Sequence, residues 1–133
     1  MRLNTVMIIN AILAVVFGIV FVLIPAQAVS LYGTAPDAPL NYTIQLLGAA
    51  FLGFAVLTWS ARNATDSQAR KAIVLALFVG NCVGFIIALI GQIRNVVNAV
   101  GWLTVAIYLL LALGFGYFQF VKPAAEETST VAE

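Results

Sequence analysis

The chain has 133 residues, of which 63% are hydrophobic and 8% are charged, and its formal net charge is +1. This composition excludes a water-soluble domain, in which about 25% of residues are charged, and the nearly balanced charge excludes the basic surface of a nucleic-acid-binding protein. With no histidine and only one cysteine, Cys82, the sequence supplies no ligand set for a metal or a haem and no internal disulfide.

Four apolar runs divide the chain. They cover residues 5 to 24, 42 to 60, 71 to 92 and 99 to 121, and Lys71 is the only charged residue within these bounds. A bilayer core about 30 Å thick needs about 20 helical residues, so each run predicts a membrane-spanning helix. The sequence therefore predicts an all-α integral membrane four-helix bundle that forms a single domain over residues 1 to 122. Residues 123 to 133, which are rich in Glu and small residues, are predicted to be a disordered cytoplasmic tail.

The first run has two interpretations. Arg2 precedes it and Ala26-Gln27-Ala28 follows it, as in a signal peptide with a small-residue cleavage site. The apolar stretch from residue 6 to residue 24 is longer than the roughly 7 to 15 residues of a signal-peptide core. A retained helix is therefore favoured, and cleavage after Ala28 stays the alternative.

The connection over residues 25 to 41 is the longest between two runs. Its first part, residues 26 to 32, predicts a short helix that lies flat at the membrane surface. Gly33 is expected to end this helix, and Pro36 and Pro39 are expected to keep the following segment extended.

The basic residues predict the orientation of the helices, because Lys and Arg concentrate in cytoplasmic loops. A cytoplasmic N-terminus places five of the six basic residues on that side, namely Arg2, Arg62, Arg70, Lys71 and Lys122, and only Arg94 on the other. Both termini are therefore predicted to be cytoplasmic.

Small residues four positions apart predict where the helices pack, because they let helix backbones approach closely in lipid. Each run holds such a pair: Ala14 and Gly18, Ala49 and Gly53, Gly80 and Gly84, and Ala112 and Gly116. In the third run the series is longer and comprises Ala72, Ala76, Gly80, Gly84 and Ala88. The third helix is therefore predicted to be the central packing element, although small residues are common in any spanning helix.

Two amide side chains lie within the apolar runs, Asn10 in the first and Asn81 in the third. Because an unpaired amide in hydrocarbon is costly, both are expected to face protein. They either bond to each other and lock the two helices together, or they face a ligand between the helices.

A second polar group is predicted at the outer membrane level. Gln45, Gln92, Arg94 and Asn98 converge there in the predicted topology. These residues form either a solvated rim or a vestibule that contacts an anionic lipid headgroup or a polar ligand.

A first helix that ends at Pro25, the segment Leu31-Tyr32-Gly33 and the second-helix segment LLGAAFLG, residues 46 to 53, follow one another in this chain. This pattern resembles small bacterial four-helix membrane proteins of unknown function that are grouped loosely with the DoxX-like proteins. The resemblance spans residues 5 to 121 and implies a bacterial inner-membrane location. Some DoxX-like proteins are subunits of quinone-linked oxidoreductases, but no functional residue of theirs can be matched onto this chain.

The expected function follows from what the four runs lack. They hold no carboxylate pair, no histidine and no phosphate-binding loop, so neither an enzyme nor a cofactor-binding protein is expected. The leading hypothesis is a non-catalytic accessory or assembly subunit that packs through its small-residue helix faces. Its expected partners are membrane lipids and a membrane-protein partner or further copies of itself. The alternative is a protein that binds or transports a lipid, a quinone or another apolar small molecule within the bundle.

Overall fold

The computed structural model describes residues 2–65 and 67–121, which form an all-helical structure without strands. The four long helices are α1 (Leu3–Leu23), α3 (Ala38–Ala61), α4 (Gln68–Ile93) and α5 (Gly101–Gly116). At its end α5 continues into a π-helical turn, η1 (Tyr117–Val121). A short helix, α2, Pro25–Leu31, follows α1. Four spans are long and apolar enough to cross a membrane, as the four apolar runs predict. The predicted tail, residues 123 to 133, lies outside the described residues.

The long helices α3 and α4 begin earlier than the apolar runs suggest, because polar residues cap them. The Asp37 carboxylate accepts a hydrogen bond from the Leu40 N–H at 2.8 Å, and the Ser67 hydroxyl accepts one from the Arg70 N–H at 3.2 Å. Pro39 therefore lies in the first turn of α3, where no N–H is needed, and does not belong to an extended segment.

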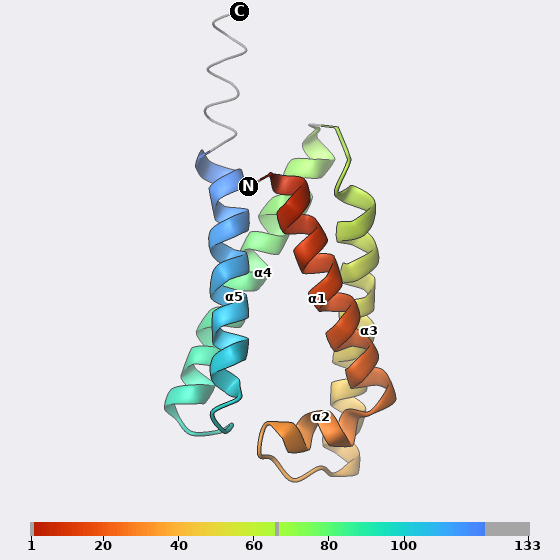
Figure 1. Cartoon of the computed structure of the whole chain (residues 1–133), viewed down its shortest axis with the longest axis vertical. Helices are drawn as coiled ribbons and strands as arrows, with labels where there is room; N and C mark the ends of the chain where they lie inside the picture. Colours follow the sequence, from red (N-terminus) through yellow and green to blue (C-terminus); the bar gives the residue numbers. More distant parts are fainter. Residues whose placement is uncertain (1, 66, 122–133) are drawn as a thin grey trace, which may run out of the picture.

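The helix α2 forms where the sequence predicts a short helix over residues 26 to 32. Pro25 occupies its first turn and Gly33, with φ +82°, follows its end. This left-handed conformation suits glycine and ends the helix. Figure 1 shows α2 running across the lower end of the bundle, at an angle to the long helices.

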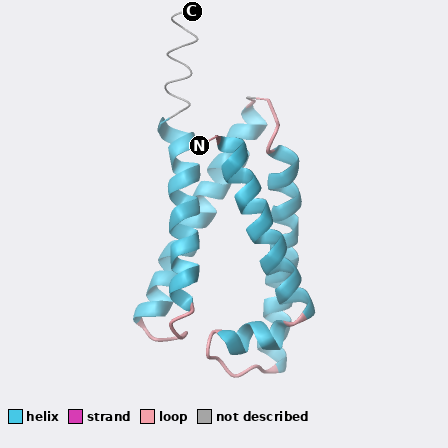
Figure 2. Ribbon diagram, in the orientation of Figure 1, coloured by secondary structure: helices cyan, strands magenta, loops and turns pink. Residues whose placement is uncertain are grey.

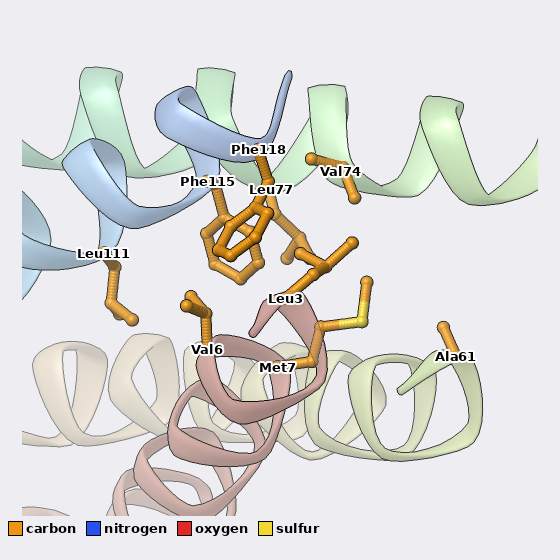
Figure 3. Packing of buried hydrophobic residues seen from close by; sticks show 9 residues of the cluster. All are labelled: Leu3, Val6, Met7, Ala61, Val74, Leu77, Leu111, Phe115 and Phe118. Atoms are coloured by element: carbon orange, nitrogen blue, oxygen red, sulfur yellow. The ribbon is translucent and has the colours of Figure 1, made fainter. Parts of the chain in front are cut away.

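The long helices form two pairs, α1 with α3 and α4 with α5, and contacts between the pairs are few. Figures 1 and 2 show the pairs converging at the end where the chain starts and diverging toward α2. A core cluster joins them at the converging end, and it consists of Leu3, Val6, Met7, Ala61, Val74, Leu77, Leu111, Phe115 and Phe118. In Figure 3 side chains from α1 point into this cluster toward those of α4, α5 and η1. Side-chain packing in the core cluster thus closes this end of the bundle.

Glycines mark the closest helix contacts within each pair. Gly48 of α3 lies against Gly18 of α1, since a Cβ added to Gly48 would come within 2.9 Å of the Gly18 carbonyl oxygen. In the other pair Gly84 faces the ring of Tyr108, and Gly116 faces Phe78. The Gly18 contact agrees with the predicted small-residue face of the first helix, but its partner Gly48 was not predicted.

The structure differs from the prediction that the third spanning helix is the central packing element. α4 packs mainly on α5, whereas α1 contacts both α3 and α5. Of the predicted packing residues, Ala14, Gly18 and Ala112 are buried, Gly84, Ala88 and Gly116 are half-buried, and Ala49, Gly53, Ala76 and Gly80 are exposed. Small residues alone do not mark a contact face, because a lipid-facing helix surface tolerates them equally well.

Candidate functional site

The divergence of the two helix pairs leaves a pocket between them, with a volume of about 370 Å³. This volume is within the roughly 300 to 1,000 Å³ that is typical of small-molecule sites. Its lining is mostly apolar and consists of Asn10, Leu13, Ala14, Phe17, Phe21, Tyr32, Ile44, Leu47, Phe51, Phe54, Ala76, Leu77, Gly80, Asn81, Thr104, Ile107, Tyr108 and Leu111. None of these residues, as far as the described chain shows, carries a formal charge at neutral pH.

The core cluster forms one end of the pocket. Leu77 and Leu111 belong to both the cluster and the pocket lining, so the lining continues directly into the packed core. Farther along α1, the rings of Phe17 and Phe21 lie against Phe51 of α3, with their ring centroids 6.4 Å and 5.8 Å from the Phe51 centroid. These three rings give the pocket an aromatic wall on the side of α1 and α3.

Hydrogen bonds around Asn98 close the other end of the pocket, and we call this group of contacts the latch. The Asn98 side-chain amide donates to the Leu31 carbonyl at 2.9 Å, and its backbone N–H donates to the Tyr32 carbonyl at 2.9 Å. The Asn98 Oδ1 atom accepts from the Val100 N–H at 3.0 Å. The hydroxyls of Tyr32 and Thr104 lie 2.7 Å apart and share a hydrogen bond. The latch therefore ties the end of α2 to the start of α5.

The pocket opens sideways between α3 and α4. Its exposed lining residues all belong to these two helices and are Leu47, Phe54, Ala76 and Gly80. Lining residues on α1 and α5 are buried or half-buried. Since α3 and α4 scarcely contact each other, a ligand can enter between them without passing the latch or the core cluster.

The two predicted amides both line the pocket, and they do not bond to each other. Each is only 7% exposed. The Asn10 amide nitrogen donates to the Thr58 hydroxyl at 3.5 Å, and the Asn81 amide nitrogen donates to the Leu77 carbonyl at 2.7 Å. Thus Asn10 links α1 to α3, whereas Asn81 bonds within α4.

The predicted outer polar residues do not meet at one site. The Gln45 amide donates to the Val22 carbonyl at 3.1 Å and so belongs to the α1 and α3 pair. Gln92 is buried beside Gly101 in the other pair, and Arg94 is exposed at the end of α4. The Asn98 side chain is occupied by the latch, in which it bonds to backbone groups of Leu31 and Val100. The contact between Tyr32 and Thr104 could not be predicted, because the two residues are 72 positions apart in the chain and only the tertiary structure brings them together.

We expect the variant Asn98→Asp to open the latch. The carboxylate keeps the acceptor for the Val100 N–H but loses the donor to the Leu31 carbonyl, which then faces another oxygen. Because this hydrogen bond is exposed, its loss is expected to cost about 0.5 to 1.5 kcal/mol locally. Hydrogen exchange measured by mass spectrometry should become faster in α2 and around residue 98.

Asn95→Asp is the matched control for this experiment. Asn95 is exposed in the same loop and has φ 58°, a conformation that Asp also tolerates. Exchange in α2 should stay at the wild-type rate in this variant. Equal exchange rates in both variants would show that the latch does not hold α2.

Comparison with known proteins adds one relationship. A family described as "Domain of unknown function (DUF8292)" matches residues 1–118, which include α1 to α5 and the start of η1. No curated protein and no solved structure matches the chain significantly. The function of the pocket must therefore be inferred from the residues that line it.

Proposed function

The chain belongs to the DUF8292 family, and we propose that it is a multi-pass membrane protein that binds an apolar small molecule, such as a lipid or a quinone, between its helix pairs. The observation that carries this proposal is the uncharged, largely apolar pocket of about 370 Å³ that opens between α3 and α4. Apolar lining with a few polar groups is the usual character of small-molecule sites. The proposal includes no catalytic step and no cofactor.

The outer surface of the bundle supports a membrane location. Large apolar side chains project outward from each long helix, among them Leu23, Val56, Ile87 and Leu110, which are 65% to 72% exposed. In water a contiguous surface of this kind promotes aggregation, whereas lipid accommodates it without cost. The DoxX-like resemblance adds the bacterial inner membrane to the proposal.

The positions of the basic residues support an orientation with both termini in the cytoplasm. Arg2, Arg62 and Arg70 lie at the converging end of the bundle, near the start of α1, the end of α3 and the start of α4. Arg62 also stacks on Trp59, with its guanidinium carbon 3.8 Å from the ring centroid, a pairing suited to a membrane interface. Lys122 lies outside the described residues. In this orientation the pocket lies on the outer side of the core cluster.

The variant Gly80→Phe tests ligand binding. Gly80 lines the pocket at its opening, and a Cβ added there meets no atom within 4 Å, so a larger side chain can enter the pocket without distorting the helices. After mild solubilisation, native mass spectrometry and lipid analysis should find at least tenfold less bound small molecule per protein, because the new ring occupies its space.

Gly53→Phe provides the control, since Gly53 is also free of neighbours but lies outside the pocket lining. It should retain the bound molecule at the wild-type level. Equal amounts of bound molecule in the wild type and both variants would refute the proposed pocket function.

A second candidate function is the accessory or assembly subunit expected from the small-residue faces. Ala49 and Gly53 leave a flat exposed strip on α3, which is the observation that favours a partner helix. The same two variants separate the functions. Gly53→Phe should release a partner subunit and keep the small molecule, whereas Gly80→Phe should do the reverse.

A further inference from the structure

The hydrogen bonds of the two buried amides, Asn10 and Asn81, show which end of each amide group is the oxygen. The Asn81 nitrogen lies 2.7 Å from the Leu77 carbonyl, which can only accept, so this end of the amide must be the nitrogen. The Thr58 hydroxyl donates its proton to the Phe54 carbonyl at 2.7 Å and can therefore only accept from Asn10. The neighbours of each amide thus determine which end is the oxygen.

The Oδ1 atoms of Asn10 and Asn81 accept no hydrogen bond from the residues that the structure describes, although both side chains are more than nine-tenths buried. Neither oxygen is sealed within the protein, and both residues line the pocket from helices of different pairs. A buried acceptor that stays unpaired is costly. The pocket therefore offers two acceptors to a ligand that brings a donor.

The same lining disfavours a charged headgroup. It contains no Lys or Arg to neutralise a phosphate or a carboxylate, and its polar groups are uncharged amides and hydroxyls. Beyond the amides, the aromatic wall of Phe17, Phe21 and Phe51 suits a hydrocarbon chain. A ligand that matches both parts has an uncharged hydroxyl at one end and an apolar chain at the other.

We propose that the pocket selects uncharged long-chain alcohols, a class that includes isoprenoid alcohols and acylglycerols, through the free oxygens of Asn10 and Asn81. This inference rests on the proposed function, because it names the class of molecule that the pocket binds. The alcohol enters between α3 and α4, its hydroxyl donates a hydrogen bond to an amide oxygen, and its hydrocarbon chain packs along the aromatic wall.

The test uses three probes with the same hydrocarbon chain, namely hexadecanol, hexadecyl methyl ether and hexadecanoate. Each is titrated against the full-length protein in lipid nanodiscs, and occupancy is measured by native mass spectrometry. Wild-type protein should bind the alcohol about tenfold more tightly than the ether, because only the alcohol donates a hydrogen bond to the buried acceptors. The carboxylate should bind more weakly than the alcohol.

Asn81→Leu removes one of the two acceptors at nearly constant volume and should reduce the preference for the alcohol over the ether, and the double variant Asn10→Leu/Asn81→Leu should abolish it, while both variants still bind the ether. Asn10→Leu provides a second, independent variant should the first fail to fold. Equal binding of alcohol and ether by wild-type protein, or tighter binding of the carboxylate, would overturn this inference while leaving the pocket function in place. Absence of binding for all three probes would overturn both the inference and the proposed function.

Discussion

The variant Phe115→Ala is expected to loosen the junction between the two helix pairs. Phe115 is fully buried, and it lies in the core cluster with residues of α1 and α4 such as Met7 and Leu77. Loss of its ring leaves a void where the pairs meet. A buried Phe→Ala change costs about 3 to 5 kcal/mol in water-soluble cores. We expect about 2 kcal/mol in this bundle, since lipid replaces water around the separated helices and only the packing contacts are lost.

Unfolding by a denaturing detergent, followed by circular dichroism and tryptophan fluorescence, measures this loss. Leu113→Ala is the control, because Leu113 lies on the same helix and is 62% exposed. Its unfolding midpoint should stay close to that of the wild type. A Phe115→Ala protein as stable as the control would mean that the core cluster does not hold the pairs together.

The second large effect is expected at the crossing of α1 and α3. An alanine at position 48 would place its Cβ 2.9 Å from three atoms of α1, namely the Gly18 carbonyl oxygen, the Phe21 Cβ and the Val22 Cγ2. The Gly18 oxygen is a backbone atom and the Phe21 Cβ is bonded directly to the backbone, so neither can move away by a side-chain rotation. The helices must therefore separate, at an expected cost of about 1 to 3 kcal/mol.

Gly53→Ala is the matched control on the same helix, where an added Cβ meets no atom within 4 Å. Alanine favours the helix over glycine by about 1 kcal/mol, so this variant should be as stable as the wild type or more stable. Thermal unfolding of both variants in the same detergent separates the two cases. A Gly48→Ala protein that unfolds at the Gly53→Ala temperature would contradict the close crossing.

Local features of the structure were predictable. The four long helices follow from runs of apolar residues, and the short helix α2, with Gly33 just beyond its end, follows from the turn chemistry of one segment. The helices α3 and α4 start before the apolar runs, because Asp37 and Ser67 cap them within polar sequence. A hydropathy pattern carries no information about such caps.

The positions of Asn10 and Asn81 illustrate how far prediction of the site could reach. A buried amide must face protein or a ligand, and both residues do line the pocket. Their actual partners, Thr58 and the Leu77 carbonyl, depend on how the helices cross and on local rotamers. Nothing in the spacing of residues along the chain determines either.

The sequence by itself determined the helical class and the number of long apolar helices, because helix length and side-chain hydropathy are properties of short segments. Only the tertiary structure decided which helix faces pair. In α3 the face that contacts α1 is the one with Gly48, which lies against Gly18, whereas the predicted face with Ala49 and Gly53 is exposed. The physical reason is that the outer surface of this bundle also carries many large apolar side chains, so the periodicity of apolar residues cannot mark the buried side. The pocket lies where the two helix pairs diverge, and this arrangement is likewise a property of the tertiary structure.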